Sequence, residues 1–296
     1  MKSDFGSSNV FSRTWKKPIF YGWWLVAITL FLNAGTGSPV FGGVGVWVDS
    51  LEMHFGWTRT QLSLAFSLGQ LEGSFIGPIV GILVDRIGPR NVVCIGVAII
   101  GVGFVIFSQT QSLLMFYLSY LVIMLGASGG GWLPMMTVLN NWFDKRRTMA
   151  MGLGGLGFSM GSFLLVPLLA WLVRPQNVGW QTTSLVLGIT FIIVAYPISR
   201  FIRNNPEEYG EIPDGKNSQF NDGDASLLVT TVSEIGYSIQ KILAMPVFWL
   251  ISICHGLSTM LIGTMMVHFV LALKDQGMSV QTGAWVWGIT LGVSGI

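Results

Sequence analysis

The sequence predicts an all-α membrane protein, a bundle of helices that cross a lipid bilayer. Of its 296 residues, 51% are hydrophobic, only 10% are charged and 38 are glycine, which is not the composition of a soluble globular domain. Apolar runs of about twenty residues, the length a helix needs to cross a bilayer, recur along the chain. Short charged turns separate these runs, as expected because charges are costly in lipid.

Seven apolar runs are long enough to span a membrane, and an eighth begins near residue 280. The seven are expected at 19–42, 61–83, 91–110, 113–140, 147–173, 181–201 and 246–272. We therefore expect a cytoplasmic tail (1–18), a six-helix membrane half (19–202), a cytoplasmic linker (203–244) and the start of a second half (245–296). The first run lacks a small-residue cleavage pattern, which indicates an anchor rather than a removable signal.

Basic residues predict which side of the membrane each loop faces. With the N-terminus in the cytoplasm, the inner segments hold 13 of the 16 Lys and Arg, and only Arg59, Arg174 and Lys274 fall outside. Cytoplasmic loops are enriched in Lys and Arg, and Trp residues such as Trp23 and Trp57 sit at expected span ends as in an aromatic belt. We expect a multi-pass protein of the cell membrane with a cytoplasmic N-terminus.

The linker has a different composition from the spans around it. Its part 203–232 is acidic and polar, so it is not expected to bury a core. Over 233–243 the apolar residues recur at helical spacing, which indicates either a short helix on the inner membrane surface or a plain linker helix. Six spans, a long linker and the start of a second set are typical of a transporter with two six-helix halves, each an inverted three-plus-three repeat.

Several other activities lack the residues they would need. The run GLGGLG at 152–157 fits the dinucleotide pattern, but it follows a charged loop, and Asn177 stands where the ribose-binding acid would be. Cys94 and Cys254 have no metal-ligand spacing, and no basic tract indicates a nucleic-acid partner. No phosphate loop, zinc-binding helix or nucleophile elbow is present. We expect neither an enzyme nor a cofactor or metal.

The charged turn between the second and third spans carries the most specific motif. It reads Gly81-Ile-Leu-Val-Asp85-Arg86-Ile-Gly88-Pro89-Arg90 and resembles the signature loop of the major facilitator superfamily. Further matches are Tyr21-Gly22-Trp23-Trp24, Gly56-Trp57-Thr58-Arg59, Asn141-Trp142-Phe143 with Arg147, Pro206-Glu207-Glu208-Tyr209-Gly210 and Pro213-Asp214-Gly215. Together they resemble the bacterial monocarboxylate-porter and oxalate/formate-antiporter-like branch.

The resemblance covers residues 18–296 and implies a fold and a function. A family member has twelve spans, so we expect a C-terminally truncated bundle: a complete N-terminal six-helix half plus the first one to two helices of the C-terminal half. The implied function is secondary transport of a small organic anion, a carboxylate, as symport or antiport, with protons as a candidate coupling ion. The alternative is a membrane scaffold or sensor, derived from such a transporter, that no longer transports.

The resemblance also implies a role for the charged turn. In the family this cluster latches the two halves in one conformation, and we carry that role to Gly81, Asp85, Arg86, Gly88 and Arg90. Asp85 is expected where the next helix begins, near its backbone donors and the positive end of its dipole. The two arginines can pair with it or with anionic lipid. The alternative is a hairpin that only sets the topology.

The second span carries two further features. Gly69, Gly73, Gly77 and Gly81 recur every four residues and predict a flat face against which another helix packs closely. Glu72 is the only acidic residue deep in a predicted span, at a depth where a charge costs about 2.5–3.5 kcal/mol. It is either a proton-coupling residue that faces a cavity or a neutral carboxyl that hydrogen-bonds to a neighbouring helix.

Four more residues are candidates for contact with the substrate. His255 and His268 lie in the seventh span, where either can protonate near neutral pH and meet a carboxylate. Their alternative is an ordinary hydrogen-bond partner within the membrane. Asn33 and Trp132 lie in spans one and four, which line the central cavity in the family, and their alternative is interhelical packing. The expected partners are a small organic anion, protons and the lipid bilayer.

Overall fold

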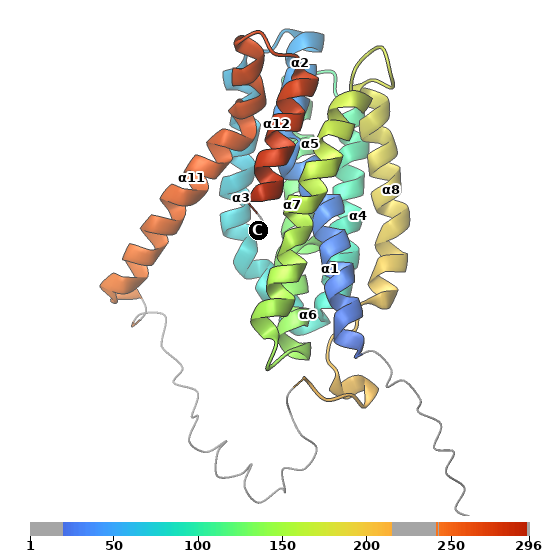
Figure 1. The fold of residues 1–296 in the computed structure, drawn as a ribbon, viewed down its shortest axis with the longest axis vertical. Helices are drawn as coiled ribbons and strands as arrows, with labels where there is room; N and C mark the ends of the chain where they lie inside the picture. Colours follow the sequence, from blue (N-terminus) through green and yellow to red (C-terminus); the bar gives the residue numbers. More distant parts are fainter. Residues whose placement is uncertain (1–19, 215–240, 242, 295–296) are drawn as a thin grey trace, which may run out of the picture.

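The computed structural model describes residues 20–214, 241 and 243–294 and shows a bundle of long helices (Figure 1). The helices of these residues are, in chain order, α1 (Tyr21–Gly37), η1 (Ser38–Gly42), α2 (Val44–Phe55), α3 (Arg59–Ile87), α4 (Pro89–Ser108), α5 (Leu113–Gly130), α6 (Trp132–Trp142), α7 (Arg147–Leu172), α8 (Trp180–Phe201), η2 (Glu207–Tyr209), α11 (Pro246–Asp275) and α12 (Val280–Val293). Among them η1 is a π-helical turn and η2 a short 3₁₀ helix.

Seven helical segments are long and apolar enough to cross a membrane, with α1 and η1 forming one segment and α5 and α6 another. They coincide with the seven predicted runs, and α12 begins where the eighth is predicted. The all-α membrane class is thereby confirmed. One boundary differs, because α2 extends the first helix to Phe55, beyond the predicted end at residue 42. The segment stays helical because its apolar side chains, such as Val48 and Leu51, are fully buried.

The two ends of the bundle hold different connections (Figure 1). At the linker end lie the α3–α4 turn, the α6–α7 turn and residues 202–214; at the opposite end lie α2, the α7–α8 loop and the α11–α12 turn. Local sequence explains where helices begin. Thr58 and Gln61 form a capping box at the start of α3. Gly88, at φ +82°, allows the tight turn into α4, whose first residue is Pro89.

Small residues let the helices approach closely. A Cβ added at Gly157 in α7 would lie 2.2 Å from the carbonyl oxygen of Leu30 in α1. One added at Gly96 in α4 would lie 2.2 Å from the backbone nitrogen of Gly130 in α5. Both glycines therefore bring helix backbones into contact, as is common in membrane bundles. The glycine-rich run at 152–157 serves helix packing, as its place in the sequence predicts.

The start of the second half touches the first half unevenly. In α11 the buried residues are Val267, Val270 and Leu271, near its C-terminal end, where it packs against α2. Residues 246–262 of the same helix are exposed, and this part leans away from the bundle towards the linker end (Figure 1). In contrast, α12 packs along α7. Contact between the two halves is thus concentrated away from the linker end.

Residues 203–214, the described part of the acidic segment, dock onto the linker end through polar contacts without joining the hydrophobic core. Asp214 accepts three hydrogen bonds from the backbone N–H groups of residues 144–146, at 2.6, 3.1 and 3.1 Å. The Arg203 guanidinium lies between the rings of Tyr21 and Tyr209, 3.8 and 4.2 Å from their centroids. The predicted helix over 233–243 falls almost wholly outside the described residues.

Candidate transport site

Glu72 lies on α3, which packs against α5, and its side chain is half-buried. Its Oε2 atom is buried and forms no hydrogen bond with any described residue. A buried carboxyl oxygen without a partner is costly unless the group is protonated or reached by water. The packing alternative requires a hydrogen-bond partner on a neighbouring helix, and the described part of the chain supplies none to this atom.

The glycine face of α3 is covered tightly at Gly69 and loosely at Gly73, where an added Cβ would lie 4.0 Å from Oγ of Ser128 in α5. A Cβ added at Gly69 would lie 2.7 Å from Cγ of Met124 in α5, but at Gly77 and Gly81 no described atom comes within 4 Å. Among the described residues the close approach that this face allows is therefore made by α5 at its Gly69 end, while the rest of the face is open. The reason is that α5 contacts the half of α3 nearer the opposite end, and no described helix covers the glycines beyond it.

Asn33 and Trp132 are placed differently from each other. Asn33 is 5% exposed, and its side-chain amide donates to the carbonyl of Gly154 in α7 at 3.1 Å. This is the interhelical contact of the packing alternative. Trp132, the first residue of α6, is 57% exposed, and its ring edge lies against Gly155. Its surface is therefore available to a ligand or to another helix.

The two histidines lie on α11, and both are exposed. His255 belongs to the part that leans away from the bundle, and His268 to the part beside α2. In the described residues, no hydrogen bond or ion pair joins any two of the candidates Glu72, Asn33, Trp132, His255 and His268. The structure thus does not assemble them into one contact network.

The charged turn differs in one respect from its expected geometry. Asp85 lies in the last turn of α3 with its side chain exposed, and it pairs with neither arginine of the motif. The start of α4 is held instead by Asn204, whose Oδ1 accepts a hydrogen bond from the Arg90 backbone N–H at 3.0 Å. A Cβ added at Gly88 would lie 2.5 Å from Nδ2 of the same asparagine. Asn204 reaches α4 because residues 203–214 dock here.

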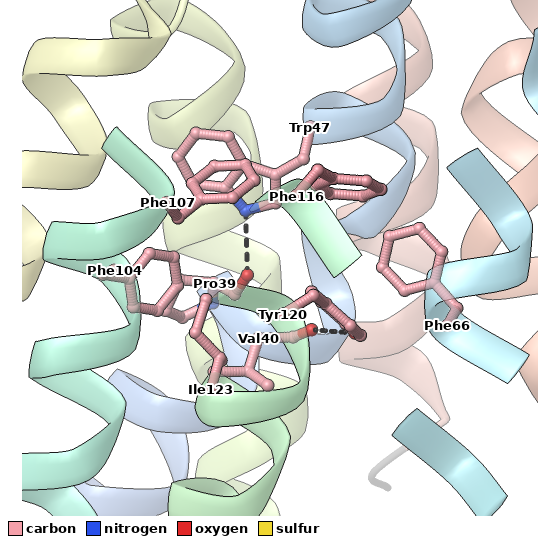
Figure 2. A pocket seen from close by; sticks show the side chains of 9 residues that line it. All are labelled: Pro39, Val40, Trp47, Phe66, Phe104, Phe107, Phe116, Tyr120 and Ile123. Atoms are coloured by element: carbon pink, nitrogen blue, oxygen red, sulfur yellow. Dashed lines mark hydrogen bonds between the residues drawn. The ribbon is translucent and has the colours of Figure 1, made fainter. Parts of the chain in front are cut away.

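A break in the first helix lies inside an aromatic cluster (Figure 2). Pro39 falls within the π-helical turn, and two side chains bond to backbone carbonyls freed there: Trp47 Nε1 donates to Pro39 at 2.9 Å and the Tyr120 hydroxyl to Val40 at 3.4 Å. The rings enclose a cavity of about 10 Å³. Room for roughly one water is too little for an organic anion, so this site is structural.

The second half reaches the same break. Trp287 in α12 is 4% exposed, and its indole N–H donates to the carbonyl of Gly42, the last residue of η1, at 3.0 Å. Nearby, the Gln281 side chain donates to the carbonyl of Pro167 in α7 at 3.0 Å. These are specific polar contacts between the two halves.

Ion pairs join the two halves at the opposite end. Arg59, at the start of α3, binds Glu52 of α2 at 3.1 Å and Asp275 of α11 at 2.5 Å. Beside them, Lys274 of α11 pairs with Asp49 of α2. The structure therefore closes this end with charged contacts as well as apolar ones.

The comparisons with known proteins decide the family. A family model described as Major Facilitator Superfamily matches residues 23–296. This chain belongs to the major facilitator superfamily. Because the model spans most of the chain, the membership rests on the bundle as a whole and not on the charged turn alone.

Curated relatives of this major facilitator protein include monocarboxylate transporters. Monocarboxylate transporter 13 of Rattus norvegicus is 30% identical over 172 residues, which make up 56% of this chain and 39% of the relative. Monocarboxylate transporter 3 of Gallus gallus is 29% identical over 175 residues, 58% of this chain and 32% of the relative. The chain thus spans well under half the length of these relatives. They are transporters and not enzymes.

Two solved structures share the fold. A bacterial homologue of the human lysosomal transporter Spinster, in an inward-facing and unoccupied conformation, superposes with a TM-score of 0.67 at 17% identity, covering 95% of this chain and 61% of that one. A D-xylose–proton symporter superposes with a TM-score of 0.63 at 12% identity, covering 93% and 67%. At these identities the likeness concerns the helix arrangement.

Sequence reasoning missed several polar residues of this major facilitator protein. Arg59 and Lys274 stand out in the sequence as basic residues on the side expected to carry few. Basic residues at that end of the bundle indicate carboxylate partners nearby. Asp275 pairs with Arg59, and Asp49 pairs with Lys274. For Asn204 the sequence gives no comparable signal, because its contact with α4 depends on how residues 203–214 dock onto the linker end.

Proposed function

We propose that this major facilitator protein acts as a secondary transporter that moves a small organic anion, a carboxylate, across the cell membrane by alternating access. The substrate class is supported by the similarity to proteins named monocarboxylate transporters, which extends over 56% of the chain. We place the N-terminus in the cytoplasm, because 13 of the 16 Lys and Arg then lie on that side. The linker end is then the inner end of the bundle.

The observation that carries the proposal is the uneven contact between the two halves. At the opposite end α11 is tied to α2 and α3 by the pairs of Lys274 and Asp275 with Asp49 and Arg59. Towards the linker end the same helix stands away from the bundle with residues 246–262 exposed. Alternating access needs two halves that close one end while the other is open. The charged contacts at the opposite end are of the kind that would close one end, and they support the proposal.

We further propose that Glu72 carries the coupled proton. Its support is the buried Oε2 atom, which has no hydrogen-bond partner among the described residues. A carboxyl in this setting favours its neutral form, and access to water would let it release the proton. His255 and His268 stay predictions as partners of the substrate carboxylate.

The charged turn keeps its proposed role as a latch between the halves. Gly81 of the turn and Gly77, one helical turn before it on α3, have no described atom near an added Cβ and leave room for a helix to approach closely. Asp85 and Arg86 are exposed at the same end and available to such a helix. The alternative, a hairpin that only sets topology, requires no contact there.

Counterflow tests the transport proposal. The full-length protein, reconstituted into liposomes loaded with unlabelled substrate, would be exposed to a panel of radiolabelled mono- and dicarboxylates and to sugars. We expect transient accumulation of at least one carboxylate and none of the sugars. Folded protein that accumulates no carboxylate would contradict the proposal and favour the scaffold or sensor alternative.

A further inference from the structure

A cavity of about 590 Å³ lies at the opposite end of the bundle, apart from the residues considered so far as the transport site. It is bounded by α2, the end of α7, the α7–α8 loop and the first residues of α8 and α12. Sites for small molecules typically measure about 300–1,000 Å³ and combine apolar walls with a few polar groups. None of Glu72, Asn33, Trp132, His255 and His268 lines this cavity.

Part of the cavity wall is apolar and aromatic, and the rest is polar. Met53 from α2, Trp171 from α7, Trp180 from α8 and Val280 from α12 contribute to the apolar part. Trp180 is 5% exposed and packs edge-on against other rings, so this wall is rigid. Such a surface suits the hydrocarbon part of a small organic ligand.

Among the polar side chains that line the cavity, Arg174 and His54 are the ones that can be positively charged. Arg174 lines the cavity, and its side chain forms no ion pair or hydrogen bond with a described residue. The ring of His54 packs edge-on against Trp180, with centroids 5.5 Å apart, and its nitrogens bond to no described residue. The carboxylate that also lines the cavity, Asp49, is already paired with Lys274. The charge left over in the cavity is therefore positive.

The loop that carries Arg174 is held in one shape by its own hydrogen bonds. The Arg174 carbonyl accepts the backbone N–H groups of Asn177 at 3.0 Å and Gly179 at 3.1 Å. The Asn177 side chain donates to the carbonyl of Trp171 at 2.7 Å. Gly179 adopts φ +85°, a conformation that favours glycine and closes the loop. The backbone that carries Arg174 is therefore fixed, and less of it must be ordered when an anion binds.

We infer that this cavity is a second binding site for the transported class of ligand, a small monocarboxylate with an apolar body, at the mouth opposite the linker end. Arg174 binds the carboxylate through the paired N–H groups of its guanidinium. His54 donates a further hydrogen bond, and the tryptophan rings cover the apolar body. The inference rests on the proposed function for the ligand class. It goes beyond the proposed function because it names a binding site outside the central pathway.

Protection of a cysteine from a maleimide tests the site directly. Met53, which is 66% exposed at the cavity, would be changed to Cys in the full-length chain with Cys94 and Cys254 replaced by Ser. The probe is cyclohexanecarboxylate, with cyclohexanecarboxamide as its uncharged match. We expect the carboxylate, but not the amide, to slow labelling. Arg174→Gln should raise the concentration for half-protection about tenfold or more, as loss of a charge-assisted pair implies.

Two matched controls accompany this experiment. Arg200→Gln removes an arginine at the linker end and should leave protection unchanged. A cysteine at Met149, 57% exposed at the same distant end, should label at one rate with and without the carboxylate. Equal protection of both cysteines would indicate a general change in the protein and overturn the site.

The remaining outcomes separate the site from the proposed function. If counterflow of carboxylates succeeds but the cysteine at 53 is not protected, the site is refuted and the transport proposal stands. If the cysteine is protected but no carboxylate is transported, the site stands and the transport proposal fails. Equal protection by chloride or sulfate would refute the assignment to carboxylates.

Discussion

Arg59 donates hydrogen bonds to both carboxyl oxygens of Asp275, at 2.5 and 2.9 Å, across 216 positions of the chain. The same guanidinium also binds Glu52, so one side chain joins α2, α3 and the end of α11. Two-oxygen pairing fixes the direction of approach as well as the distance. In this major facilitator protein the contact holds the first and second halves together at the end away from the linker.

Lys274 and Asp49 form the neighbouring ion pair. Replacing Lys274 should lower the free energy of unfolding more than replacing Asp49. The Asp49 side chain is 7% exposed and that of Lys274 33%. Lys274→Met leaves a buried carboxylate unpaired, which we expect to cost about 1–3 kcal/mol. Asp49→Asn keeps an acceptor and leaves a more exposed ammonium, so we expect less than about 1 kcal/mol. Thermal unfolding of the purified protein in detergent measures both.

Lys145→Met is the control for this comparison, because the exposed Lys145 lies at the linker end. It should leave the melting temperature unchanged. If Asp49→Asn lowers the melting temperature more than Lys274→Met, the unpaired buried carboxylate is not the main cause of the lost stability.

Glu72→Gln should separate proton coupling from transport. The amide keeps the size and hydrogen-bonding ability of the carboxyl but cannot take up or release a proton. We expect uptake driven by a pH gradient to fall to background while exchange of one carboxylate for another continues. Radiolabelled uptake into liposomes, with and without the gradient, measures both. Glu207→Gln, at an exposed position after α8, should behave as the unmodified protein. Full pH-driven uptake in Glu72→Gln would return Glu72 to a packing role.

Trp287→Phe should weaken the contact of α12 with the break in the first helix. The ring volume is largely kept, but the carbonyl of Gly42 loses its donor at 3.0 Å. A buried acceptor left without a partner costs about 1–3 kcal/mol. We expect a lower unfolding midpoint in detergent, and no change for Trp285→Phe, whose side chain is 46% exposed. Equal midpoints for the two variants would mean that the hydrogen bond contributes nothing measurable.

Asn204→Ala should destabilise the start of α4. Its Oδ1 accepts the Arg90 N–H at 3.0 Å, and loss of a side chain that caps a helix start costs about 0.5–2 kcal/mol. Gly88→Ala should cost more, because φ is +82° and the added Cβ would lie 2.5 Å from Nδ2 of Asn204. Asn140→Ala, at an exposed position of α6, is the control. Denaturation in detergent ranks the three variants, and an Asn204→Ala midpoint equal to that of Asn140→Ala would contradict the capping role.

Much of the fold could be predicted because lipid restricts the choices of the backbone. A run of about twenty apolar residues in a bilayer satisfies its N–H and C=O groups only as a helix. The positions of the spans and the turn at Gly88 follow from that rule and from local chemistry. The extension of the first helix to Phe55 was harder to see, because the polar and glycine residues after Pro39 resemble a span end.

The candidate site could be predicted only in part. Glu72 stands out because a lone acid in an apolar run is conspicuous, and the motif around Asp85 because its spacing is specific. Asn33 shows the limit of such reasoning, since a polar residue in a span can line a pathway or bond to a helix. Its hydrogen bond to the carbonyl of Gly154 depends on the packing of α1 against α7, which the sequence does not show.

By itself, then, the sequence determined the class of protein, the order of its spans and the superfamily motif, because these depend on hydrophobic length and on neighbours within a few residues. The tertiary structure alone decided which polar groups meet: Asn204 with the start of α4, Trp287 with Gly42, and Arg59 with Asp275. Such pairs depend on the rotation and closeness of helices far apart in the chain. No local pattern encodes that, because each partner alone is only a polar residue near a helix end or break.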